Sequence, residues 1–344
     1  MTLSAMPILI RRFICALTFL LLLAPAVASA ADETPARCQG TDMLTEMASK
    51  DPNAYEKVMA ESQALPNTEA MLWKIEKPGV PVSYLFGTMH LSDPRIATLS
   101  PTVKDAIAHS TSVALEVADL SDKAVAAAMA KTASLIIYTN GESLKSALTA
   151  DEYKDVQQTV AKAGMPGELA ATMKPWLVSM LLATSDCERK QLAAGKTVLD
   201  LQVAAEAQKH GIAIKGLETI EDQLNALASI PDDQQIAMLK VGLKFIDRAD
   251  DMTETLVQMY TKRQIGAAMP FQLALAAESG ISPSVFDGFK KSLLINRNAK
   301  MRDAAVPLLD KGDAFIAVGA LHLPGPTGLV ALLRQSGFTV TPVE

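Results

Sequence analysis

The chain has few cysteines, few aromatic residues and only four histidines among its 344 residues. Its three cysteines are far apart, whereas a structural zinc site needs closely spaced pairs, so such a site is excluded. The formal net charge is −6, and basic residues form no obvious cluster. Because proteins that bind nucleic acid or anionic membranes usually carry a basic patch, we expect neither as a partner.

Several common catalytic and nucleotide-binding motifs are also missing. The sequence contains no His-Glu-x-x-His motif of zinc proteases and no Gly-x-Ser-x-Gly turn of serine hydrolases. It has neither a P-loop nor a glycine-rich dinucleotide fingerprint. These absences exclude the enzyme classes that a short motif would reveal.

A long apolar run occurs only near the start of the chain. Arg11 and Arg12 precede the apolar segment 13–23, and Ala28-Ser29-Ala30 supplies the small residues of a cleavage site. This order is typical of a secretory signal peptide. A membrane anchor is the alternative, but the run is short and Pro25 follows it closely.

We therefore predict a signal peptide at residues 1–30 and a single domain at residues 31–344, in a periplasmic or secreted location. Stable membrane insertion is not expected after cleavage, because no later run is long enough to span a bilayer. Of the cysteines, Cys38 and Cys187 remain after cleavage. An oxidising compartment favours a disulfide between them.

Short apolar runs separated by long helical patterns predict an α/β fold with a small central mixed β-sheet surrounded by many α-helices. Two of these runs flank Lys77-Pro78-Gly79, which indicates a hairpin. From residue 121 to residue 208 the pattern is almost entirely helical. The predicted strands cover residues 71–76, 80–86, 111–117, 211–216, 314–319 and 338–342.

Two of the predicted strands end in the same way, with a glycine, two further residues and a histidine. They are the segments 83–90 and 314–322, which end in His90 and His322. Glycine lets the backbone turn sharply at this point and approach its neighbours closely. The histidine then lies beyond the carboxyl end of its strand, where α/β proteins bind ligands. If the two strands are neighbours, both imidazoles reach one point.

Two carboxylates follow other predicted strands. Glu116 lies in the apolar run 113–117, where an unpaired carboxylate would be destabilising. Glu218 follows the strand at 211–216, although a role in capping the helix that starts at Thr219 is an equal alternative. Two imidazoles and one or two carboxylates suit a manganese, cobalt or zinc ion with an open coordination position. One carboxylate could be a ligand and the other a general base.

These motifs together resemble the TraB/GumN family, which is related to the Tiki proteases of animals and more distantly to erythromycin esterases. The resemblance implies a Tiki/erythromycin-esterase-like α/β fold and a site made of His90, His322, Glu116 and Arg297. It also implies a divalent metal ion and a peptide or protein substrate, because Tiki proteins are metal-dependent peptidases. The motifs are Gly87-Thr-Met-His90-Leu-Ser-Asp93-Pro94, Leu115-Glu116, Gly216-Leu-Glu-Thr219, Arg297-Asn298 and Gly319-Ala-Leu-His-Leu-Pro-Gly325.

The favoured hypothesis is an exported metal-dependent hydrolase that acts on peptide bonds. His90, His322 and Glu116 are the predicted metal ligands, and Glu116, Glu218 and Arg297 are the predicted catalytic residues. One alternative is a metal-free, esterase-like hydrolase that uses His90 as its base. The other is a non-catalytic secreted protein that binds a peptide or a metal ion.

Other polar residues have simpler interpretations. His109 and His210 stand in the last turns of predicted helices, where a histidine interacts favourably with the helix end. Lys174 could bind a substrate carboxylate, but we favour a solvated lysine beside a packed Trp176. Asp200 faces apolar neighbours on a predicted helix, and for this residue a functional and a purely structural role stay equally open.

Overall fold

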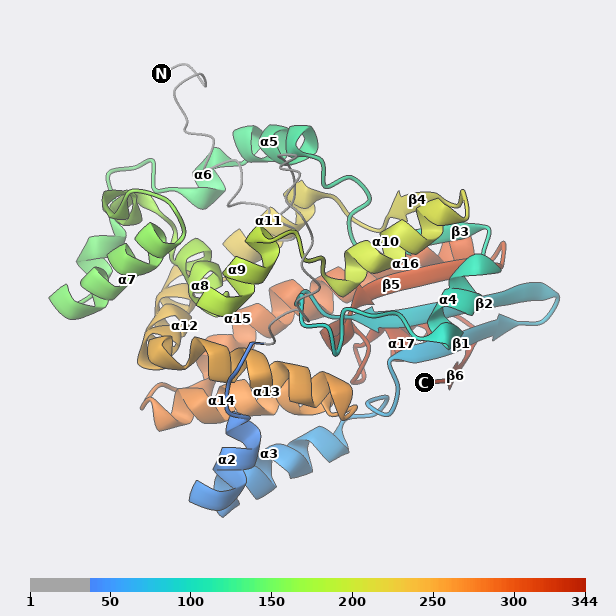
Figure 1. Cartoon of the computed structure of the whole chain (residues 1–344), viewed down its shortest axis with the longest axis horizontal. Coiled ribbons are helices and arrows are strands. Elements are labelled where there is room, and N and C mark those ends of the chain that lie inside the picture. Colours follow the sequence, from blue (N-terminus) through green and yellow to red (C-terminus); the bar gives the residue numbers. More distant parts are fainter. Residues whose placement is uncertain (1–37) are drawn as a thin grey trace, which may run out of the picture.

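The computed structural model describes residues 38–344 (Figure 1). The predicted signal peptide lies outside the described residues. A six-stranded sheet with the order β4-β3-β5-β2-β1-β6 is the centre of the described chain, and the predicted α/β fold with a mixed sheet is confirmed. The strands are β1 (Leu72–Lys77), β2 (Val80–Thr88), β3 (Ser112–Leu115), β4 (Ala213–Gly216), β5 (Ala314–Gly319) and β6 (Thr339–Pro342).

The four strands β4, β3, β5 and β2 are parallel to one another, and β1 and β6 complete the sheet through antiparallel pairs. Thr88 at the end of β2 pairs with Gly319 at the end of β5. Leu115 of β3 pairs with both Ala317 of β5 and Gly216 of β4. The carboxyl ends of four strands therefore meet along one edge of the sheet.

The predicted hairpin joins β1 to β2, where Lys77 pairs with Val80. Gly79 has a φ of +75° in the turn. This left-handed conformation strains other residues and suits glycine.

The helices lie on both faces of the sheet and extend beyond its edge. Side chains cap two of the helix starts: the Ser100 hydroxyl accepts from the N–H of Val103, and Thr149 and Glu152 form a capping box. The α-helices are α2 (Met43–Lys50), α3 (Pro52–Ala64), α4 (Pro101–Ala108), α5 (Asp122–Lys131), α6 (Ala133–Ile136), α7 (Ala150–Lys162), α8 (Pro175–Ala183), α9 (Asp186–Ala193), α10 (Leu199–Lys209), α11 (Ile220–Ala228), α12 (Asp232–Lys244), α13 (Ala249–Thr261), α14 (Ala268–Glu278), α15 (Asp287–Phe289), α16 (Asn296–Leu309) and α17 (Leu329–Gln335).

Residues 283–309 form several consecutive helical segments in the structure. A 3-10 turn (Pro283–Phe286) leads into α15, and a π-helix (Lys290–Ile295) connects α15 to α16. Single turns of π-helix are rare and occur frequently at functional sites. The remaining 3-10 segments are Leu144–Ala147, Gly167–Thr172, Ile246–Arg248, Ile265–Ala267 and Ala320–His322.

Strand β5 is buried on both faces of the sheet. Phe315 belongs to an apolar cluster that includes Ile107 of α4 and Val203 of α10. Ile316 belongs to a second cluster that includes Met301 of α16. Since successive side chains of a strand point to opposite faces, both layers of helices pack directly on this central strand (Figure 1).

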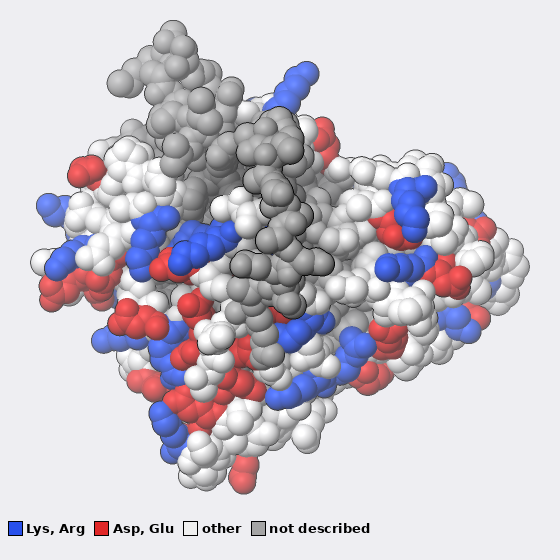
Figure 2. All heavy atoms as spheres, viewed as in Figure 1, with Lys and Arg blue, Asp and Glu red and all other residues white. Residues whose placement is uncertain are grey.

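A third apolar cluster fills the helical half of the molecule. It brings together Val156 of α7, Trp176 of α8 and Leu239 of α12. In Figure 1 these helices lie to the left of the sheet. Between residues 38 and 344, no helix combines the length and the apolar character that crossing a bilayer requires. On the face shown in Figure 2, basic and acidic side chains are interspersed.

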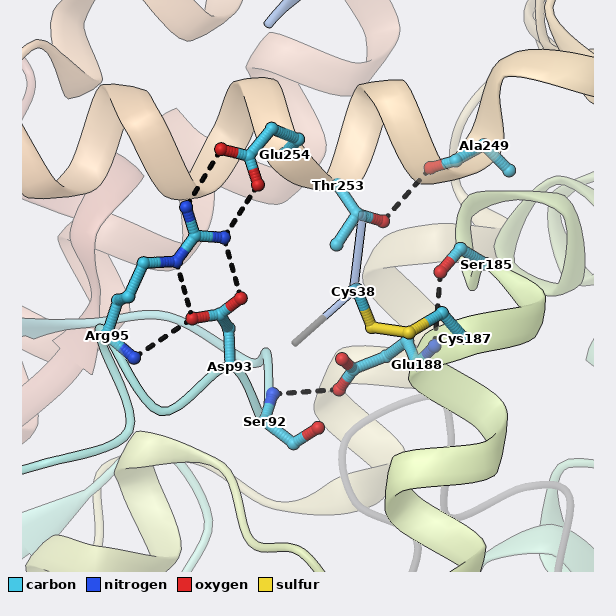
Figure 3. Close-up of a disulfide and its surroundings, with 10 residues drawn as sticks. All are labelled: Cys38, Ser92, Asp93, Arg95, Ser185, Cys187, Glu188, Ala249, Thr253 and Glu254. Atoms are coloured by element: carbon cyan, nitrogen blue, oxygen red, sulfur yellow. Dashed lines mark hydrogen bonds and ion pairs between the residues drawn. A yellow bond between two sulfur atoms is a disulfide. The ribbon is translucent and has the colours of Figure 1, made fainter. Parts of the chain in front are cut away.

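The predicted disulfide joins Cys38 to Cys187 of α9, with 5.6 Å between the Cα atoms (Figure 3). Next to it, the Ser92 N–H donates to Oε1 of Glu188 at 2.8 Å. Since Ser92 follows His90 by only two residues, α9 supports the chain directly after the first Gly-x-x-His motif.

A buried ion-pair network fixes the same loop from the other side (Figure 3). Arg95 donates to both oxygens of Asp93, at 2.8 and 2.7 Å. It also donates to both oxygens of Glu254 on α13, at 2.8 and 2.6 Å. Such two-pronged pairs fix geometry as well as supplying energy. The loop that carries His90 is therefore held between α9 and α13.

Candidate functional site

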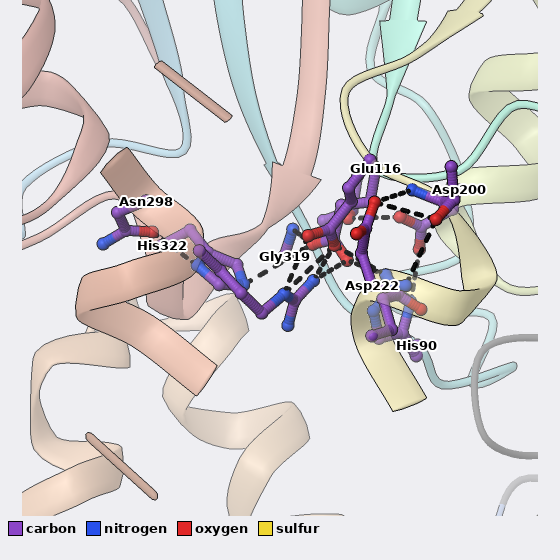
Figure 4. A network of polar contacts seen from close by, with 12 residues as sticks. His90, Glu116, Asp200, Asp222, Asn298, Gly319 and His322 are labelled. Carbon is purple, nitrogen blue, oxygen red and sulfur yellow. Dashed lines mark hydrogen bonds and ion pairs between the residues drawn. The ribbon is translucent and has the colours of Figure 1, made fainter. Parts of the chain in front are cut away.

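Four strand ends bring four of the five predicted site residues to one edge of the sheet, and Arg297 joins them from a helix. Figure 4 shows three of them, His90, Glu116 and His322, within one network of polar contacts. His90 follows β2 and Glu116 follows β3 directly. Glu218 follows β4, and His322 ends the 3-10 turn after β5. Arg297 comes from the first turn of α16 and contacts both glutamates.

Glu116 is at the centre of the hydrogen bonds. Its Oε1 accepts from the Gly319 N–H at 2.7 Å. Its Oε2 accepts from Nη2 of Arg297 at 2.7 Å and from Nε2 of Gln223 at 3.0 Å. Burial would raise the pKa of this carboxyl, but the charge of Arg297, the neighbouring imidazoles and the Gly319 N–H outweigh burial and lower it to about 2. Glu116 is therefore ionised at neutral pH.

Arg297 bridges the two glutamates. Besides its bond to Glu116, its Nε donates to Oε1 and Oε2 of Glu218 at 3.0 and 3.1 Å, and its Nη2 also contacts Glu218. The Arg297 side chain is 14% exposed and that of Glu218 is fully buried. Burial would lower the pKa of Arg297, but the two carboxylates raise it. Gln223 adds a bond from Nε2 to Oε1 of Glu218 at 2.9 Å.

Asn298 fixes the orientation and the tautomer of His322. Its Nδ2 donates to the Thr327 carbonyl at 2.8 Å, so its Oδ1 faces the imidazole. That oxygen lies 2.6 Å from Nδ1 of His322, and because an amide oxygen only accepts, Nδ1 carries the proton. Burial lowers the pKa of His322 to about 3, so the ring is neutral. Its unprotonated Nε2 lies 3.7 Å from Oε1 of Glu116.

Asp200 has the corresponding role for His90. Its Oδ2 lies 2.9 Å from Nδ1 of His90, and its Oδ1 accepts from the Thr88 hydroxyl at 2.6 Å. Burial would lower the pKa of His90, but the charge and hydrogen bond of Asp200 raise it to about 9. The carboxylate is buried, whereas 46% of the histidine side chain is exposed. Asp200, whose role the sequence left open, thus forms a hydrogen bond with a predicted site residue.

The three predicted metal ligands surround Gly319. A Cβ added at this glycine would lie 3.3 Å from Oε1 of Glu116, 3.6 Å from Cδ2 of His322 and 3.9 Å from Nε2 of His90. A residue with a side chain here would occupy the space between the three groups. The glycine of the second Gly-x-x-His motif is therefore required by the space within the site, whereas its φ of −53° and ψ of 136° suit any residue.

The donor chemistry of this arrangement fits a divalent cation. Two imidazoles and a carboxylate are common ligands of such ions. Each imidazole has a hydrogen-bond partner on Nδ1, as metal-binding histidines almost always do. However, among residues 38–344 no group of three or more His, Cys, Asp or Glu side chains is arranged so that it could hold a metal ion.

Sequence patterns did not indicate two of the polar residues at this site, Gln223 and Asn298, as functional. Gln223 stands one turn into α11 and has no pattern that distinguishes it. Asn298 directly follows Arg297 in one of the motifs that resemble the TraB/GumN family. That motif is the sequence feature that could have indicated a role for Asn298. Both act by tertiary contacts with residues far away in the chain.

The remaining polar residues lie outside this site. His109 and His210 are the C-cap residues of α4 and α10, as predicted. Trp176 is buried as expected, but Lys174 is not solvated: its Nζ lies 4.1 Å from the centre of the Tyr138 ring, and its side chain is 19% exposed. The attraction between an ammonium group and an aromatic face explains this position.

Comparison with known proteins shows which family the sequence matches. The model of the TraB/PrgY/gumN family matches residues 71–342. The chain is 26% identical over 318 residues to metalloprotease TIKI2 of Danio rerio, covering 79% of this chain and 60% of the relative. It is 24% identical over 318 residues to metalloprotease TIKI1 of Homo sapiens, covering 79% of this chain and 61% of the relative.

The chain therefore spans about 60% of the length of these curated relatives. No solved structure matches it. The family match covers the sheet from β1 to β6 and includes both Gly-x-x-His motifs. The chain belongs to the TraB/PrgY/gumN family.

Proposed function

We propose that this protein is an exported, metal-dependent hydrolase that cleaves a peptide bond in a peptide or protein substrate. The observation that carries the proposal is the convergence of His90, His322 and Glu116 around Gly319. The relatives named metalloproteases support the same reaction class. Residues 1–30 would be the signal peptide, and residues 31–344 would form one exported domain.

His90, His322 and Glu116 would hold a manganese, cobalt or zinc ion. When bound, such an ion lowers the pKa of water and polarises a substrate carbonyl. Asp200 and Asn298 would hold the two imidazoles with Nδ1 protonated, so that Nε2 of each ring is the ligand atom. Because its pKa is about 2, Glu116 is a weak base, which favours the ligand role over that of general base.

Arg297 would stabilise the negative charge that develops on the substrate carbonyl oxygen. Its two carboxylate partners, Glu116 and Glu218, keep the guanidinium protonated and in place. Glu218 was predicted as a ligand or a base. Its bonds to Arg297 and Gln223 favour a third role, in which it positions Arg297.

A metal-free hydrolase is the second candidate, and the pair of His90 and Asp200 favours it. The carboxylate 2.9 Å from Nδ1 orients the imidazole so that its Nε2 faces the site, as in a catalytic dyad. In this reading His90 is the base that activates water, and no ion is needed.

Metal retention and turnover distinguish these candidates. The purified protein is incubated with manganese, cobalt or zinc, desalted, and analysed for bound metal and for cleavage of a peptide library. The proposal expects about one ion per chain and peptide cleavage that a chelator abolishes. Alanine at His90 or His322 should abolish both, whereas alanine at His109 or His210, the matched histidine controls, should not.

The other outcomes decide between the alternatives. Hydrolysis without a retained ion, insensitive to chelator, would favour the metal-free mechanism. Neither retention nor turnover would leave a secreted binding protein as the interpretation.

A further inference from the structure

A cavity of about 350 Å³ lies among α8, α12, α13 and α14, in the helical half of the molecule. This volume is within the range of ligand-binding pockets. Its wall is almost entirely apolar and includes four methionines, Met180, Met238, Met252 and Met269. Methionine is flexible and polarizable, so a wall of this kind adapts to apolar groups of different shapes.

The polar side chains of the wall are Ser179, Gln235 and Gln272, and each donates to another group of the protein, Gln272 to the Met252 sulfur at 3.5 Å. The Ser179 hydroxyl donates to the Pro175 carbonyl at 3.1 Å, and Nε2 of Gln235 donates to the Ile230 carbonyl at 2.6 Å. Among residues 38–344, no Asp, Glu, Lys or Arg lines the cavity. A charged group entering it would be buried without a partner, so the cavity selects an apolar occupant.

Three chain segments lead from the cavity wall to the candidate site. Leu321 lines the cavity, and the next residue is His322. Leu227 lines it from α11, one turn after Gln223, which bonds to Glu116. The third segment begins at Phe289, also in the wall, and continues through the π-helix to Arg297. The cavity and the site are thus neighbours that share their supporting elements.

We propose that this cavity is the specificity pocket of the enzyme: it receives one large apolar side chain, such as leucine, methionine or phenylalanine, of the peptide cleaved at the neighbouring site. The inference rests on the function proposed above, because it assigns the substrate class of that same site. The occupant is a peptide side chain because the cavity wall includes Leu321, which directly precedes His322 of the site that would act on the peptide bond.

Gly242 of α12 offers a way to fill the pocket without disturbing the fold. It lines the cavity, and an added Cβ would meet only the Leu182 side chain, at an ordinary 3.6 Å. Leucine is also a better helix former than glycine. Gly242→Leu should therefore fold and occupy part of the pocket. Lys244→Leu is the matched control, because it adds the same side chain to the exposed face of the same helix.

The substrates are pairs of blocked peptides, one pair for each position near the scissile bond. The two peptides of a pair differ only at that position, where one has leucine and the other alanine. At one position, wild type should prefer leucine by roughly 10–100-fold in kcat/KM, as burial of an aliphatic side chain suggests. Gly242→Leu should reduce this preference to less than about threefold, and Lys244→Leu should retain it.

Binding is measured separately through the fluorescence of Trp176, which lines the pocket and is one of only two tryptophans in the chain. The expected result is a fluorescence change that leucine peptides produce and alanine peptides do not, and that is lost in Gly242→Leu. Such a result would support the pocket even if no peptide is cleaved. In that case the proposed hydrolysis fails and the pocket stands.

If the protein cleaves peptides without an apolar preference, the pocket proposal is wrong and the hydrolase proposal stands. The same holds if the preference exists but Gly242→Leu leaves it unchanged. Absence of both turnover and leucine-selective binding also overturns the pocket.

Discussion

Nε2 of His322 and Oε1 of Glu116 lie 3.7 Å apart, and neither atom carries a hydrogen that the other could accept. Two acceptors that face each other in a buried site repel unless a cation or a proton lies between them. The Asn298 contact prevents His322 from solving this by exchanging tautomers. The pair therefore provides a local reason for a positive charge beside Gly319.

Gly319→Ala should abolish the proposed hydrolysis while leaving the fold intact. With φ at −53° and ψ at 136°, the glycine has a conformation that alanine adopts without strain. The added methyl would lie 3.3 Å from Oε1 of Glu116, in the space between the proposed ligands. We expect at least a 10²-fold loss of kcat/KM, with a Tm close to that of wild type. Near-normal turnover would show that the reaction occurs elsewhere.

Arg297→Lys keeps the charge but loses the planar fork that contacts Glu116 and Glu218 together. If Arg297 stabilises the transition state, kcat should fall by roughly 10²-fold or more, as after loss of an oxyanion donor. The control is Lys300→Ala on the same helix, where the lysine is 48% exposed and pairs with Asp222. Equal activity of the two variants would limit Arg297 to a structural role.

The disulfide should contribute strongly to stability. Cys38 and Cys187 are 149 residues apart in sequence, and closing so long a loop contributes about 4–5 kcal/mol by chain entropy. Cys38→Ser with Cys187→Ser should lower the free energy of unfolding in urea by up to that amount. Thiol titration of the unreduced, unfolded wild type should find no free thiol from these two residues. Detection of both thiols would contradict the bond.

Glu188→Gln should stabilise the protein at neutral pH. Burial raises the pKa of this carboxyl above its usual value near 4.5, because only Oε1 has a partner and Oε2 has none. The folded state then binds the proton more tightly than the unfolded state, so stability decreases as pH rises through the folded pKa. Glutamine retains the acceptor for the Ser92 N–H and does not ionise.

The measurement is urea unfolding of wild type and Glu188→Gln between pH 4 and pH 8. The variant should gain stability relative to wild type as pH rises. Glu152 is a partly buried capping residue whose pKa burial would raise but the Thr149 N–H lowers, so Glu152→Gln should show the opposite trend. A parallel pH dependence of wild type and Glu188→Gln would contradict the assignment.

Export predicts a shortened chain in the cell. N-terminal sequencing of the protein from the periplasm or the medium should begin at Ala31 or within a few residues of it. Replacing Arg11 and Arg12 by glutamate removes the positive segment of the predicted signal and should leave the precursor in the cytoplasm. A soluble cytoplasmic protein that retains Met1 would refute export.

Most residues of the candidate site could be predicted because their polar side chains directly follow the ends of strands. His90, Glu116, Glu218 and His322 each follow an apolar run, and the parallel register carries all four to one edge. The pattern of a run followed by a polar residue depends only on local sequence, so the sequence alone reveals it.

Residues that act from helices could not be predicted in the same way. Asn298 and Gln223 are single polar residues in helices, and their roles depend on which distant groups the fold brings to them. Lys174 was wrongly expected in solvent for the same reason, because its aromatic neighbour, Tyr138, comes from a separate segment.

The position of β5 also determines when the site can exist. This strand lies between β3 and β2, yet it is among the last elements of the chain to be synthesised. Until residues 314–319 insert, β2 and β3 have no shared neighbour, and His90 and Glu116 are not brought to a common edge. The arrival of β5 joins the two parts of the sheet and delivers Gly319 and His322 in the same step. A chain that lacks residues 314–322 therefore lacks the assembled candidate site, and any activity of that site depends on this late segment of the sequence.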